Sequence, residues 1–199
     1  MSAFLPLLGE PPRERSDAAR NREALLCAAR QMIEDDGVGA VTMDALADAA
    51  GVGKGTVFRR FESRAGLMAA LVDEFEIEWQ TAVLSGPPPL GPGALPLDRL
   101  LAMGRSRMEV NLTHALLLEA ADWQHAGGQG AQSFMAMHTR HLLGELGVQG
   151  DLPVIATVIL APLHARILEQ QIEIDGLDLD RIHAGWSDAV RRIVSSQPL

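Results

Sequence analysis

Apolar side chains recur every three or four positions along most of the chain, which is the spacing of amphipathic helices. The first segment with this period has five such positions: Leu25, Ala28, Ala29, Met32 and Ile33. Asp35, Asp36 and Gly37 follow, and glycine is the usual residue where a helix ends in the left-handed conformation. The pattern therefore predicts a first helix that ends at about Asp36.

Two short helices and one long helix are predicted next. Thr42 is a suitable N-cap for a second helix that Gly51 ends, and Gly53 can begin a third helix in which Val57 and Phe61 point inward. Ser63 then caps a fourth helix, whose apolar stripe runs to about Leu84: Met68, Leu71, Val72, Phe75 and Trp79.

Residues 85–96 contain five prolines and three glycines, a composition that breaks helices and predicts a loop. Helical periodicity then resumes in five segments: 97–110, 112–125, 130–146, 152–175 and 178–195. No alternating β-branched run indicates a strand, so the sequence predicts an all-α fold.

Composition places the chain among globular proteins. It has 199 residues, 47% apolar and 22% charged, and a single cysteine that cannot form an internal disulfide. The longest apolar run, 154–163, contains Thr157 and Pro162 and is well short of the ~20 residues that span a bilayer. We expect no membrane span, no signal peptide and a cytoplasmic location.

The negative charge is unevenly distributed. The net charge of −9 argues against binding to nucleic acid, but residues 1–65 carry only −1 of it and residues 66–199 carry −8. Within the first part, Lys54, Arg59, Arg60 and Arg64 are opposed only by Glu62, which makes a basic patch. Such a patch on an acidic chain is typical of a local DNA-binding surface.

Residues 42–67 combine a short capped helix, a turn with glycine and a second short helix with a basic outer face. This is the layout of a helix-turn-helix, whose second helix enters the major groove of DNA. Spacing alone leaves open the alternative of a basic, solvated helix pair.

The segment from Arg22 to Leu71 resembles the DNA-binding domain of the TetR family of bacterial regulators. The matching positions are Ala28-Ala29, Gly37, Thr42, Leu46-Ala47, Ala50-Gly51-Val52, Gly55-Thr56, Phe61, Ser63-Arg64 and Leu67. The resemblance implies a three-helix DNA-binding domain at 20–65 after a flexible tail at 1–19. Residues 66–199 would form a helical bundle for ligand binding and dimerisation.

The resemblance also implies roles for individual residues. Lys54, Thr42, Thr56 and Arg64 would contact DNA phosphates, while Gly55 would let the helix approach closely. Arg59 and Arg60 are the candidates for reading bases, because a guanidinium can pair with both acceptors of guanine. The exposed ring of Phe58 would meet a thymine methyl or turn into the core. Two hydroxyls common in the family are missing, since Gly53 stands for serine and Phe58 for tyrosine. The arginines that precede the first helix could form an arm for the minor groove: Arg13, Arg15, Arg20 and Arg22.

For the second part, the resemblance implies a dimer interface on the last two helices and a pocket for a small apolar effector. The interface candidates are Ile159, Leu163, Ile167, Trp186, Val190 and Ile193. The pocket candidates are Trp79, Met103, Leu116, Trp123, Phe134, Met137 and His138. Both sets are equally compatible with an ordinary core.

Signals for enzymatic chemistry fail on spacing. Residues 51–56, GVGKGT, lack the first glycine and the serine or threonine of a phosphate-binding loop. His138 and His141 share a helix face without an evident third metal ligand, and Cys27 has no adjacent base. We expect no catalytic activity, cofactor or metal.

The sequence therefore predicts a homodimeric regulator, a repressor that binds palindromic double-stranded operator DNA and is released by a small molecule. The alternative is a helical module that binds a small molecule or protein and has impaired DNA binding. An enzyme that uses the histidine pair is a third option.

Overall fold

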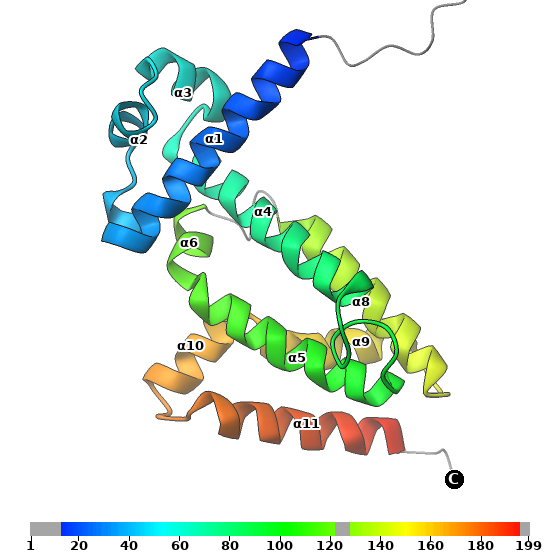
Figure 1. Cartoon of the computed structure of the whole chain (residues 1–199). Helices are drawn as coiled ribbons and strands as arrows, with labels where there is room; N and C mark the ends of the chain where they lie inside the picture. Colours follow the sequence, from blue (N-terminus) through cyan, green and yellow to red (C-terminus); the bar gives the residue numbers. More distant parts are fainter. Residues whose placement is uncertain (1–12, 122–127, 196–199) are drawn as a thin grey trace, which may run out of the picture. The chain divides into compact units, whose positions relative to one another are not determined.

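The computed structural model describes residues 13–121 and 128–195, with side chains from 20 and 133 onward in the two ranges (Figure 1). Its helices are α1 (Arg13–Asp36), η1 (Val38–Ala40), α2 (Met43–Ala49), α3 (Lys54–Phe61), α4 (Arg64–Ser85), α5 (Pro96–Thr113), α6 (Ala115–Ala120), α8 (Gly128–Glu145), α9 (Leu152–Leu160), η2 (Ala161–Leu163), α10 (Ala165–Glu173) and α11 (Leu179–Ser195). The described ranges contain no strand, which confirms the predicted all-α class.

The helices differ from the predicted ones in three places. The helix predicted at 152–175 is divided into α9, η2 and α10, because Pro162 lacks a backbone N–H and His164 is extended, with ψ 134°. α6 is shorter than the predicted helix at 112–125, whose end lies outside the described residues. α1 begins at Arg13, inside the segment predicted as a tail.

The chain divides into two compact units, Met1–Leu71 and Val72–Leu199. α4 runs through this division, so one continuous helix contributes residues to both units. The first unit is built on residues from α1 to α4 that are almost fully buried, among them Leu25, Leu26, Leu46, Val57 and Leu67.

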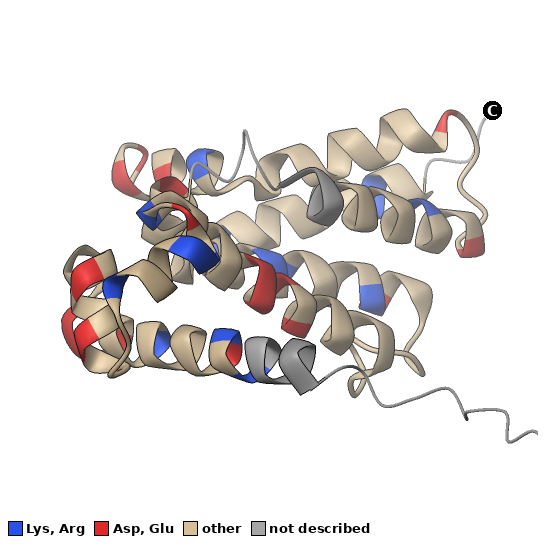
Figure 2. Cartoon of the chain, turned by 90° about the horizontal axis from the view of Figure 1, so that it is seen from above, with Lys and Arg blue, Asp and Glu red and all other residues tan. Residues whose placement is uncertain are grey.

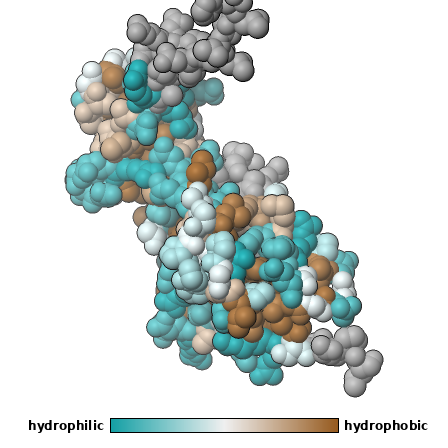
Figure 3. Space-filling model, turned by 45° about the vertical axis from the view of Figure 1, so that its right-hand side comes forward, coloured by the Kyte–Doolittle hydropathy of each residue, from teal (hydrophilic) through white to brown (hydrophobic). Residues whose placement is uncertain are grey.

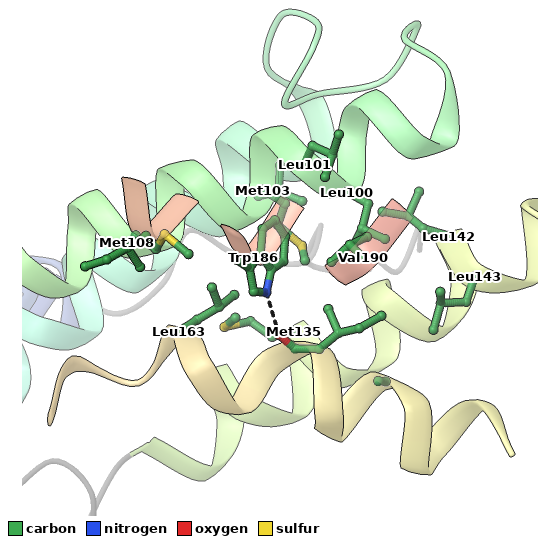
Figure 4. Close-up of a cluster of buried hydrophobic side chains, with 14 of the residues drawn as sticks. Leu100, Leu101, Met103, Met108, Met135, Leu142, Leu143, Leu163, Trp186 and Val190 are labelled. Carbon is green, nitrogen blue, oxygen red and sulfur yellow. Dashed lines mark hydrogen bonds between the residues drawn. The ribbon is translucent and has the colours of Figure 1, made fainter. Parts of the chain in front are cut away.

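The second unit has a core in which α5 contacts α8, α10 and α11. Trp186 of α11 points into this core, and its indole N–H donates to the carbonyl of Ile159 at 2.8 Å (Figure 4). The indole also lies against Gly104 of α5 so closely that a Cβ there would be 2.1 Å from the ring. Glycine is therefore required at position 104 by packing.

Within the described ranges, no single helix is long and apolar enough to cross a membrane, and only the bent pair 152–163 and 165–173 passes that test of length and composition.

Candidate nucleic-acid interface

The helix-turn-helix forms through caps that the sequence encodes. Thr42 is extended, and its hydroxyl accepts from the backbone N–H of Ala45 at 3.1 Å, which starts α2. Gly51, two residues after the end of α2, has φ 64°. The N–H of Val52 bonds to the carbonyl of Ala47, and that of Gly51 bonds to Asp48. This pair of bonds is the Schellman arrangement, in which glycine adopts the left-handed conformation readily. The turn between α2 and α3 is therefore fixed by local bonds.

α3 is anchored by one face and exposed on the other. Val57 and Phe61 are buried, as their spacing predicted, and they hold the helix against the unit's core. The outer positions are exposed: Lys54, Gly55, Phe58, Arg59 and Arg60. Thr56 is half-buried. Both arginines are exposed on the side opposite the anchored face.

The position of Phe58 decides whether its ring is exposed or turned into the core. Its side chain is 47% exposed, so it does not turn into the core. A Cβ added at Gly53 or Gly55 would meet no atom within 4 Å, which shows that neither glycine is required by packing inside the chain. The outer side of α3 near Gly55 is thus open to a close approach.

Lys54, the only lysine in the chain, forms an ion pair with Asp44 of α2. The two charged groups are 2.7 Å apart and both are exposed. The hydrogen bond with Asp44 raises the pKa of the Lys54 ammonium above its usual value. A phosphate must therefore compete with Asp44 for this lysine. Figure 2 shows that basic and acidic positions are interspersed along the helices.

Arg64, predicted to contact a DNA phosphate, is hydrogen-bonded within its own unit, and its contact with DNA stays a prediction. Its Nε donates to the carbonyl of Val41 at 2.8 Å, and its Nη2 donates to the carbonyl of Val38 at 2.6 Å. Two of its nitrogens are thus used to fix the segment that joins η1 to α2. The half-buried guanidinium at the start of α4 thus adds a partner to the Val38 carbonyl, which already accepts from the Val41 N–H, and binds the Val41 carbonyl just before α2.

The proposed N-terminal arm is described only in part. The side chains of Arg13 and Arg15 lie outside the described residues. Arg20 is exposed, whereas the Arg22 guanidinium lies 5.9 Å from the centre of the Phe61 ring. Arg22 therefore packs on α3 within its own unit.

The predicted pocket residues divide into two groups. Trp79, Met103 and His138 are buried in the second unit, and Phe134 is half-buried. Trp79 and Phe134 meet edge to face with ring centres 6.0 Å apart, and Phe134 stacks on His138 at 5.8 Å.

Leu116 is 68% exposed and Met137 is 57% exposed, so neither side chain lies in the core of the second unit, and their place in a pocket stays a prediction. Trp123 lies outside the described residues. In the described part of the chain, no three His, Cys, Asp or Glu side chains are close enough to hold a metal ion.

Four of the predicted interface residues belong to the core of a single chain. These four are Ile159, Leu163, Trp186 and Val190, each at most 7% exposed. They face inward because α11 packs its apolar stripe on α5 of the same chain (Figure 4). Only Ile167, which is 41% exposed, and the half-buried Ile193 remain at the surface.

Sequence reasoning missed two polar features. Asp44 was not paired with Lys54, although a helix-turn-helix brings the start of α2 near the start of α3. Glu76 is buried beside Arg107, and a signal for it existed: Glu76 lies between Val72 and Trp79 on the apolar stripe of α4.

Comparison with known proteins identifies the family of the helix-turn-helix domain. Residues 25–71 match the model of the family described as bacterial regulatory proteins, tetR family. No curated protein matches the chain significantly.

Several solved structures share the fold across most of the chain. A TetR-family transcriptional regulator from Pectobacterium atrosepticum has a TM-score of 0.67 at 19% identity, covering 89% of this chain and 94% of its own. RolR in complex with resorcinol has a TM-score of 0.63 at 19% identity, with 92% and 91% covered. NalD, the secondary repressor of the MexAB-OprM multidrug efflux pump in Pseudomonas aeruginosa, has a TM-score of 0.55 at 16% identity, with 89% and 96% covered. Residues 25–71 therefore form a DNA-binding domain of the tetR family, and the chain as a whole shares the fold of TetR-family transcriptional regulators.

Proposed function

We propose that this protein is a homodimeric repressor that binds a palindromic operator and is released by a small molecule. The observation that carries the proposal is the outer face of α3, where Arg59 and Arg60 are exposed beside Lys54 while Val57 and Phe61 anchor the helix. An anchored helix with exposed guanidiniums suits the major groove, where arginine can bind guanine O6 and N7.

Different residues of this face should act differently. Replacement of Arg59 or Arg60 by alanine should cost ~1–3 kcal/mol of binding free energy and relax preference at one position of each half-site. Lys54→Ala should weaken binding to all sequences and make the salt dependence shallower, because a phosphate contact releases counterions without reading sequence. Arg140→Ala, on the exposed side of α8, is the matched control. Native specificity and salt dependence in all three α3 variants would contradict the proposal.

Dimerisation requires a surface other than the four predicted interface residues that are buried in the core of the single chain. The outward face of α9, α10 and the residue directly after α10 carries exposed apolar side chains: Val154, Val158, Ile167 and Ile174. Figure 3 shows hydrophobic side chains at the surface of the second unit. We assign this face to a second copy of the chain, since two helix-turn-helix units must be held together to read two half-sites.

The dimer can be tested without disturbing the fold. Val158 is 57% exposed in the single chain, so Val158→Glu should leave the chain folded and produce monomers by sedimentation. Leu116→Glu on α6, which is 68% exposed, is the control and should remain dimeric. A Val158→Glu protein that stays dimeric would place the interface elsewhere.

Release by a small molecule rests on the continuous helix α4, which contributes residues to both units. A ligand that binds the second unit can lower operator affinity only if it prefers one of two states of the protein. Operator DNA must then lower ligand affinity by the same factor. Equal ligand affinity with and without operator would contradict this part of the proposal. The alternative of a helical binding module with impaired DNA binding has no specific observation in its favour.

A further inference from the structure

A charged pair lies buried in the second unit, outside the helix-turn-helix. Glu76 of α4 and Arg107 of α5 are 5% and 6% exposed, and Oε1 of the carboxylate is 2.5 Å from Nη1 of the guanidinium. Burial of two charges is costly, and apolar residues of similar volume are often as stable or more so. Fold stability alone therefore does not explain this pair.

The pair is only half satisfied. Oε2 of Glu76 and Nε of Arg107 are buried and have no hydrogen-bond partner among the described residues. Oε2 of Glu76 is an acceptor and Nε of Arg107 is a donor, and the two atoms belong to the two partners of one ion pair. A buried charged atom without a partner costs free energy, so a group that both donates and accepts would be favoured beside it.

A tryptophan ring adjoins the guanidinium, and a phenylalanine ring adjoins the tryptophan. The Arg107 guanidinium lies 5.1 Å from the centre of the Trp79 ring, and Phe134 meets that ring edge to face. The indole N–H of Trp79 is already used, because it donates to Ser106 at 3.0 Å. Rings in this arrangement favour an aromatic partner.

From these observations we infer that the Glu76–Arg107 pair binds the hydroxyl of a small neutral phenol, with its ring against Trp79 and Phe134. The hydroxyl would donate to Oε2 of Glu76 and accept from Nε of Arg107. The pair has no net charge and therefore favours a neutral ligand. A carboxylate would be repelled by Glu76, and an ammonium would be repelled by Arg107. The inference names the effector class of the proposed function and rests on it.

Phenol and toluene provide a matched pair of probes, since they differ by a hydroxyl in place of a methyl group. Titration calorimetry on the full chain should show phenol binding at least tenfold more tightly than toluene, with benzoate and benzylamine weaker than phenol. A site that hydrogen-bonds a hydroxyl rejects the analogue without it, because its own polar groups then stay unpaired.

Two double variants separate this role from a structural one. Glu76→Leu/Arg107→Met replaces the buried pair by apolar residues, so the chain should stay folded and bind toluene as tightly as phenol. Glu109→Leu/Arg105→Met removes a partly exposed pair on α5, together with the ion pair from Arg105 to Asp180, and should retain the preference for phenol. Circular dichroism would verify folding of both.

Three outcomes would overturn the inference: no phenol binding by the native chain, equal affinity for toluene, or a phenol preference that survives in Glu76→Leu/Arg107→Met. DNA selection on the same protein distinguishes the two proposals. Selected operator DNA without phenol binding removes only this inference, whereas phenol binding without any selected DNA removes only the proposed function.

Discussion

Replacement of Arg64 by alanine tests whether this arginine holds the DNA-binding unit together. The substitution removes hydrogen bonds from Nε to Val41 and from Nη2 to Val38, at 2.8 and 2.6 Å. A hydrogen bond from a charged group contributes about 1.5–3 kcal/mol. Because the site is only half-buried and water can replace part of each bond, we expect a loss of about 2–4 kcal/mol in the unfolding free energy of the first unit.

Two spectroscopic signals locate the effect. All three tryptophans lie in Val72–Leu199, so their fluorescence follows the second unit, while far-ultraviolet circular dichroism follows both. Urea unfolding of Arg64→Ala should begin earlier by circular dichroism, and Arg64→Lys should recover part of the loss because one ammonium can still bind a carbonyl. Arg59→Ala, at an exposed position, should change stability by less than ~0.5 kcal/mol. Unchanged stability of Arg64→Ala, with weaker DNA binding and shallower salt dependence, would instead make Arg64 a phosphate contact.

Three further substitutions have definite expectations. Gly104→Ala forces a Cβ against a buried indole and should lower the unfolding free energy of the second unit in urea by about 1–3 kcal/mol. Gly185→Ala is the control, because a Cβ there meets nothing within 4 Å, and it should raise the unfolding free energy by up to ~1 kcal/mol. Equal effects of the two substitutions would refute the packing argument. Asp44→Asn should free Lys54 and steepen the salt dependence of DNA binding by about one phosphate, and no change in an electrophoretic titration would show that the ion pair is not competing. Burial, together with Arg99, lowers the pKa of His138 below 6.5, so the unfolded chain binds a proton more readily and the second unit should lose stability as pH falls below that value. His138→Gln should reduce this loss of stability in unfolding titrations from pH 7 to 5. An undiminished pH dependence would show that His138 is not its source.

Local patterns predicted the helix-turn-helix well because its determinants lie close together in sequence. The Thr42 cap, the break at Gly51 and the inward pair Val57 and Phe61 each depend on residues within four positions. The structure reproduces all of them. The direction of Arg64 was not predictable in this way, because its partners are 23 and 26 residues away.

The second unit was predicted less well because an apolar stripe does not specify its partner. The stripe that contains Trp186 and Val190 suits a neighbouring chain or a core equally, and the choice depends on Gly104, which lies far away in sequence on α5. Leu116 and Met137 were assigned to a pocket by residue type, yet their helices turn them to solvent. The Pro162 break was visible in the sequence and could have divided the predicted helix at 152–175.

Selection of bound fragments from random double-stranded DNA tests the central claim most directly. If α3 reads bases as part of a homodimer, the selected fragments should share two inverted half-sites whose centres are about one helical turn apart, ~34 Å, or a multiple of it. Arg59→Ala and Arg60→Ala should relax the consensus at matching positions of both half-sites. A native protein that enriches no sequence, or only an asymmetric one, would contradict the account.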